Sequence, residues 1–106
     1  NEDEGEEQRD LLAEMELTAR LMITGGEAKE DEKMSRADRS AIRQAILLAA
    51  EKTSQETPPR QVLTGDVKAA LEELSRRQDI RPERASRLAD GRSNGYFLHW
   101  GKWSIL

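Results

Sequence analysis

The most apolar stretch of the chain is residues 39–50, which read RSAIRQAILLAA. Its apolar side chains recur at steps of three and four, the spacing that gathers them on one face of an α-helix. Ser35 precedes this stretch with Asp38 three residues later, which is the spacing of a helix capping box. The sequence therefore predicts a central helix over about residues 36–53. Its apolar face consists of Ile42, Ala45, Ile46 and Ala49, widened by Leu47 and Leu48.

Three further segments have a helical period and predict helices over about residues 6–24, 64–77 and 82–90. Each supplies one apolar stripe that can be buried against the central helix. In chain order, the stripes are Leu11, Leu12, Met15, Ala19, Met22 and Ile23; then Val67, Ala70, Leu71 and Leu74; then Ala85, Leu88 and Ala89.

Residues that start or stop helices separate these segments. Gly25-Gly26 predicts the end of the first helix, and residues 27–33 are interpreted as a solvated loop. Thr64 is the expected N-cap of the third helix, with Asp66 in its first turn, where a negative charge suits the helix dipole. Pro82 suits the first turn of the last helix, and Gly91 is expected to end it.

The whole chain is predicted to be all-α, a small bundle of three to four short helices. It comprises a poorly ordered acidic leader (residues 1–10), a helical domain (11–90) and a loosely packed aromatic tail (91–106). The 106 residues carry a net charge of -4 and contain no cysteine, which excludes disulfides and thiolate metal sites. No apolar run reaches the ~18 residues that a membrane span needs. An opening as acidic as residues 1–10 suits a piece of a longer polypeptide.

The tail differs from the rest because all the aromatic residues lie there. Three interpretations stay open: a flap over the helices, a docking segment for a partner or parent strand, and an unrelated terminus. Three glycines interrupt the tail, so we expect it to be extended or loosely packed. Its distinctive residues are Tyr96, Phe97, Trp100, Trp103 and the single histidine, His99.

A cluster of arginines follows the third helix. Because guanidinium groups bind phosphate through two parallel hydrogen bonds, four of them are candidate contacts for an anion or a partner. The alternative is a solvated surface with local ion pairs such as Glu83–Arg87. No residue has the spacing of a catalytic, cofactor-binding or metal site. The four candidates are Arg76, Arg77, Arg81 and Arg84.

The middle of the chain resembles the TraC/TrbE-like ATPases of conjugative type IV secretion. The resemblance rests on residues 39–46 (RSAIRQAI), residues 60–67 (RQVLTGDV) and Ala70-Leu71, and it covers about residues 6–90. In that family, a helical segment is inserted in the motor domain between its two nucleotide-binding motifs. It consists of an acidic lead, a helix rich in Ile and Ala, a Pro-containing loop and a Thr-x-x-Asp/Val-x-x-x-Leu helix, in the order found here.

The resemblance implies a bacterial interaction element that hydrolyses no ATP itself. The chain lacks the phosphate-binding Gly-x-x-x-x-Gly-Lys-Ser/Thr loop, and ATP and magnesium are implied only for the parent ATPase. Implied partners are the parent motor domain, neighbouring subunits and secretion-channel proteins. The implied location is the cytoplasm, at the inner face of the inner membrane. The alternative is a free-standing helical module that binds nucleic acid or regulates another protein, for which the arginine cluster is the motivating feature.

Overall fold

The computed structural model describes residues 2–24 and 26–90, and every helix or strand element in those ranges is an α-helix. The all-α prediction is therefore confirmed. The elements are α1 (Glu2–Thr24), α2 (Ala28–Glu32), α3 (Arg36–Ser54), α4 (Thr64–Arg76) and α5 (Pro82–Asp90).

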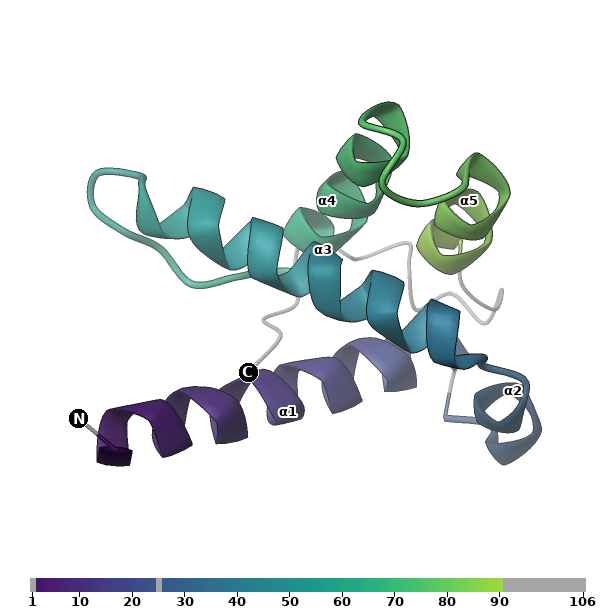
Figure 1. The fold of residues 1–106 in the computed structure, drawn as a ribbon, viewed down its shortest axis with the longest axis horizontal. Helices are drawn as coiled ribbons and strands as arrows, with labels where there is room; N and C mark the ends of the chain where they lie inside the picture. Colours follow the sequence, from purple (N-terminus) through teal and green to yellow (C-terminus); the bar gives the residue numbers. More distant parts are fainter. Residues whose placement is uncertain (1, 25, 91–106) are drawn as a thin grey trace.

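Helix α3 is the centre of the fold. It packs on α4, α1 and α5, and Figure 1 shows it running between α1 on one side and α4 and α5 on the other. Ile42 and Ile46 of α3 are almost completely buried, as the apolar stripe predicts. Leu48 is also buried, whereas Leu47 is half exposed, so the buried apolar face of α3 includes Leu48 but not Leu47.

The predicted stripes of α4 and α5 are buried, whereas the predicted stripe of α1 is buried only in part: Leu11 is 45% exposed and Leu12 partly buried. In α1 the buried residues recur every four positions, which is one narrow face of the helix. Three residues between helices complete the core, and no helical period could have identified them. The buried apolar positions of α1 are Met15, Ala19 and Ile23, and those of the connecting segments are Met34, Val62 and Ile80.

The capping box at the start of α3 is confirmed. The Ser35 hydroxyl accepts a hydrogen bond from the Asp38 N–H at 3.1 Å, and the Asp38 carboxylate accepts one from the Ser35 N–H at 3.3 Å. This reciprocal pair satisfies two backbone donors that the helix itself cannot. It fixes the first turn of α3 and the position of Asp38.

The expected N-cap at Thr64 is wrong by one residue. Leu63 is the N-cap of α4, and Thr64 lies inside the helix, buried, with its hydroxyl unpaired among the described residues. The cap comes instead from Asp66, whose carboxylate accepts the Leu63 N–H at 2.8 Å and also binds Arg60. A carboxylate at the third helical position can thus satisfy the N-cap backbone when the N-cap residue has no polar side chain.

Two other boundaries differ from expectation. Helix α1 begins at Glu2, four residues before its predicted start, and ends at Thr24 as predicted. The expected loop at 27–33 contains the short helix α2, which buries no residue. Asp31 in α2 accepts two hydrogen bonds of 2.7 Å from Arg20 of α1. This polar contact, and not the burial of an apolar face, attaches α2 to the rest of the fold. The poor order of the acidic leader stays a prediction.

Candidate functional site: arginine pockets and an apolar groove

The four predicted contact arginines lie around the turn between α4 and α5. Arg76 is the last residue of α4, Arg77 is its C-cap, and Arg81 directly precedes α5, on which Arg84 lies. Pro82 begins α5, so the two helices are separate and the arginines do not share one helical face.

The turn itself is a helix stop of defined geometry. The Asp79 N–H donates to the Leu74 carbonyl at 2.9 Å, and the Gln78 N–H donates to the Ser75 carbonyl at 3.0 Å. This is the Schellman pattern, in which the residue after the C-cap takes a left-handed conformation. Here that residue is Gln78, with φ of 65°, instead of the usual glycine. The turn buries Ile80 and projects Arg81 at the surface.

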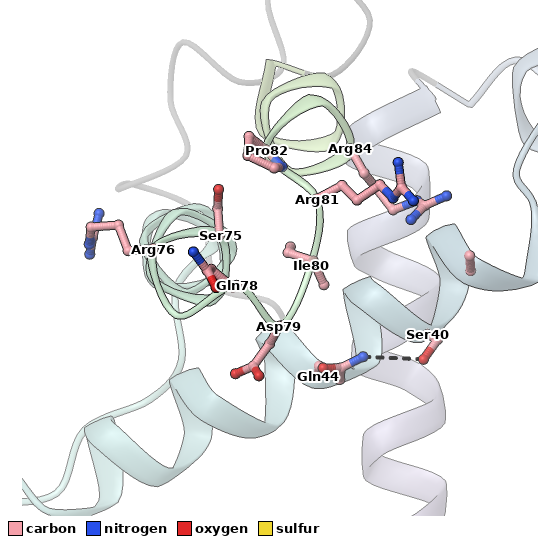
Figure 2. A pocket seen from close by; sticks show the side chains of 11 residues that line it. Ser40, Gln44, Ser75, Arg76, Gln78, Asp79, Ile80, Arg81, Pro82 and Arg84 are labelled. Carbon is pink, nitrogen blue, oxygen red and sulfur yellow. Dashed lines mark hydrogen bonds between the residues drawn. The ribbon is translucent and has the colours of Figure 1, made fainter.

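An open pocket of about 670 Å³ lies between this turn and α3. Figure 2 shows Arg81 and Arg84 extending to the same side of it, whereas Arg76 points away beyond α4. Arg81 is exposed and forms no ion pair within residues 2–24 and 26–90. Arg76 also lines the pocket and forms no ion pair in the described residues, so the pocket has two uncommitted arginines, of which Arg81 extends to the same side as Arg84. Its remaining lining residues are Ala37, Ser40, Gln44, Ser75, Gln78, Asp79, Ile80 and Pro82.

Arg84 and Arg87 are committed to a buried carboxylate. The side chain of Asp38 is only 2% exposed; it accepts from Arg84 Nε at 2.9 Å and from Arg87 Nη2 at 2.7 Å. Burial raises the pKa of Asp38, but hydrogen bonds from Arg87, the Ser35 N–H and Arg84 outweigh it and leave the pKa below 3.8. Arg87 thus pairs across helices, and the local Glu83–Arg87 pair is not the arrangement found.

Arg77 is also committed within the fold. It forms an ion pair with Glu73, one turn earlier in α4, and Glu73 also binds Lys52 of α3. The Lys52 hydrogen bond is the largest effect on Glu73 and lowers its pKa, with Arg77 adding to the shift. Of the four predicted contacts, Arg84 therefore joins α5 to α3, and Arg77 is paired within the last turn of α4. Arg76 and Arg81 form no ion pair within residues 2–24 and 26–90, so both are free to meet a ligand.

A second group of arginines, which the sequence analysis missed, lies on α3. Arg36, Arg39 and Arg43 follow each other at steps of three and four, so they share one face of the helix. With Arg20 and Glu16 of α1 they line a pocket of about 370 Å³. Their spacing is visible in the sequence, beside the apolar stripe of the same helix, and Ile42 of that stripe lines the same pocket.

An apolar groove of about 540 Å³ runs between α1 and α3. Leu11 and Leu47 line this groove from two helices, with exposed fractions of 45% and 52%. Arg9 is the one charged residue among its lining. The lining residues are Gly5, Arg9, Leu11, Leu12, Met15, Ile46, Leu47 and Ala50.

The described residues contain no group of three or more acidic or histidine side chains placed to hold a metal ion. Within the same ranges, no helix is both long enough and apolar enough to cross a bilayer. His99 and the aromatic residues of the tail lie outside the described residues, so the three interpretations of the tail stay open.

Comparisons with protein-family models, curated proteins and solved structures gave no match for this chain.

Proposed function

We propose that this chain is a protein-interaction element, similar to the helical segment inserted in the motor domain of TraC/TrbE-like conjugative ATPases. Its partners are then the parent motor domain, neighbouring subunits or secretion-channel proteins, at the cytoplasmic face of the bacterial inner membrane. The parent supplies the nucleotide site, with ATP and magnesium, because the phosphate-binding loop is missing from this sequence.

The observation that carries this proposal is the apolar groove between α1 and α3. Apolar surface that stays exposed beside a core marks contact sites for other proteins. Leu11 and Leu47 stand on two different helices at the rim of this groove, and Ile46 and Met15 form its buried floor. A partner that inserts apolar side chains here would cover both leucines and extend the existing core.

The groove suits an apolar segment of the parent motor domain. Seven of the eight described residues that line the groove are uncharged, so the buried apolar area of the partner supplies most of the affinity. The resemblance supports the same occupant, since an inserted segment lies against the domain that contains it.

The test is binding to a TraC/TrbE-type motor domain from which its own helical insertion has been deleted, measured by titration calorimetry. We expect Leu11→Glu and Leu47→Glu each to weaken binding by about tenfold or more, because a charge replaces a buried apolar contact. Leu17→Glu and Leu21→Glu are matched controls, since both leucines are at least half exposed and do not line the groove. Equal losses for all four variants, or no binding by the unmodified chain, would contradict the proposal.

An ATP-hydrolysis assay distinguishes an interaction element from an enzyme. The purified chain is expected to hydrolyse ATP no faster than a heat-killed control. Turnover above that control would show that the chain has a nucleotide site of its own, and the proposal would be wrong.

A free-standing nucleic-acid-binding module is the alternative, and the uncommitted arginines favour it. Arg36, Arg39 and Arg81 are exposed and form no ion pair within the described ranges, so each can meet a backbone phosphate. This function predicts duplex binding that weakens steeply with salt. Fluorescence anisotropy at two salt concentrations, with Arg77→Ala and Arg81→Ala, tests it; salt-sensitive binding lost in Arg81→Ala would favour the alternative.

A further inference from the structure

The arginine pocket between α1 and α3 has walls that are fixed in place. Arg43 of α3 pairs with Glu16 of α1, which joins the two helices across the pocket. Arg20 of α1 binds Asp31 of α2 through two hydrogen bonds of 2.7 Å. The side chain of Arg20 is only about one-quarter exposed. Two of the four arginines are thus already held by carboxylates of the fold.

The other two arginines have no partner. Within residues 2–24 and 26–90, the side chains of Arg36 and Arg39 make no hydrogen bond and no ion pair. Both lie in the first turns of α3, where the backbone dipole adds partial positive charge. Both also line the pocket instead of only the open surface. A pocket whose two helices are joined by ion pairs and which also contains two unpaired guanidinium groups can bind an anion.

The charge of the pocket selects the kind of anion. Four arginines face two carboxylates, Glu16 in the lining and Asp31 behind Arg20, which leaves a formal charge of two positive units. A phosphate monoester carries about -1.5 to -2 at neutral pH and has three acceptor oxygens. One such group would balance the pocket and accept bidentate bonds from both free guanidinium groups.

We propose that this pocket, formed by Arg20, Arg36, Arg39 and Arg43, binds a phosphate monoester dianion. Arg36 and Arg39 hold the phosphoryl oxygens, and the ion pairs of Arg43 and Arg20 keep the walls in place. The phosphoryl group comes from a phosphorylated side chain of a partner or from a small phosphorylated metabolite or nucleotide. This site is separate from the apolar groove and does not depend on the proposed function.

A nucleic acid fits this pocket less well. Each backbone phosphate carries a single charge, and successive phosphates follow a line, so a duplex is best met by a ridge of cations. Here, the free cations lie one helical turn apart at a concave site beside two carboxylates. The volume of about 370 Å³ is that of a small-molecule site, with room for a phosphoryl group and part of the side chain or metabolite that carries it.

Inorganic phosphate titrated into the isotope-labelled chain, followed by NMR, tests the site. We expect saturable shifts of the backbone amides of residues 36–43. Arg36→Gln and Arg39→Gln should each weaken phosphate binding by about tenfold or more, because each removes one positive charge and its bidentate contact. Arg39→Lys should lose part of the affinity, because it keeps the charge and gives up the planar fork.

Arg81→Gln is the matched control, an exposed and unpaired arginine at the other pocket. It should bind phosphate as the unmodified chain does, and so should Leu47→Glu, which separates this site from the groove. An equal loss in Arg81→Gln, or shifts that do not saturate, would show only general surface charge and overturn the proposal.

Three further ligands identify the source of the phosphoryl group. Phosphoserine and a nucleoside monophosphate should each displace inorganic phosphate. The one that binds with the lower Kd identifies whether the natural ligand is a phosphorylated side chain or a small phosphorylated metabolite. Duplex DNA should not displace it at matched phosphate concentration. Displacement by duplex DNA that also requires Arg81 would overturn the proposal and favour a nucleic-acid surface.

Discussion

Arg87 of α5 binds the buried carboxylate of Asp38, 49 residues earlier in the chain, through bonds of 2.7 and 3.2 Å. The same carboxylate caps the first turn of α3 through the Ser35 N–H and binds Arg84. One side chain therefore performs two structural tasks, starting the central helix and attaching the last helix to it.

Removing this carboxylate should be costly. We expect Asp38→Ala to lower the free energy of unfolding by about 2–4 kcal/mol, because it removes the cap and leaves two arginines without their acceptor. The side chain of Arg87 is more than half exposed, so water can solvate it when Asp38 is removed, and the loss should lie toward the lower part of that range. Urea denaturation measures the change, and Asp79→Ala, which alters an exposed aspartate, should change stability by less than about 0.5 kcal/mol. Equal effects of the two substitutions would contradict this role.

Stability should fall in acid. Burial raises the pKa values of Asp38 and Asp66, but arginine and backbone hydrogen bonds outweigh it, so both lie below 3.8 in the folded chain. The unfolded chain then binds more protons than the folded one, so this stability is complete above the unfolded pKa and is lost as pH falls through the folded pKa. We expect constant stability above about pH 5 and a decline below it. Asp38→Asn should reduce the decline, measured by urea denaturation across pH; an unchanged slope would contradict the assignment.

The centre of the core should not tolerate a charge. Ile46 is completely buried on α3, and Ile46→Asp places an unpaired carboxylate among apolar side chains, which should unfold the chain. The neighbouring substitution Leu47→Asp is the control, because Leu47 is 52% exposed and should leave the helical content unchanged. Circular dichroism compares the two. A folded Ile46→Asp variant would show that α3 is not the central element.

Replacing Gln78, in the turn after α4, with glycine should raise the free energy of unfolding. Gln78 has φ of 65°, a conformation that a side chain makes less favourable by roughly 1–2 kcal/mol and that glycine adopts freely. Glycine also has more freedom to lose on folding, so we expect Gln78→Gly to stabilise the chain by about 0.5–1 kcal/mol. Gln78→Ala keeps the strain and should give no gain. A lower urea midpoint for Gln78→Gly would contradict the left-handed turn.

Apolar period and capping signals were enough to predict four of the five helices. The helices that begin near Arg36, Thr64 and Pro82 lie within a residue or two of their predicted bounds. The apolar period defines all three, and the Ser35 cap and Pro82 fix the start of two of them. Helix α2 has no apolar stripe, and its stability comes from the contact of Asp31 with Arg20, which no local pattern encodes. Met34, Val62 and Ile80, the core residues between helices, could not be predicted either, because no helical period includes them.

The candidate site was only partly predictable. Sequence identified the arginines near the α4–α5 turn, but the long-range partner of Arg84, Asp38, depends on how α3 and α5 pack. The partner of Arg77 is Glu73, four residues earlier, a spacing that the sequence does show. The arginine face of α3 was readable from spacing alone. The apolar groove was not, because Leu11 and Leu47 belong to stripes that also contain core residues such as Met15 and Ile46.

Amide hydrogen exchange in the complex with the insertion-deleted motor domain tests the central claim most directly. It reports where the chain is covered, independently of any substitution. A partner in the α1–α3 groove should slow exchange in residues 5–15 and 46–50 and leave α4 and α5 unchanged. Protection confined to α4 and α5, with exchange in the groove as fast as in the free chain, would contradict the claim.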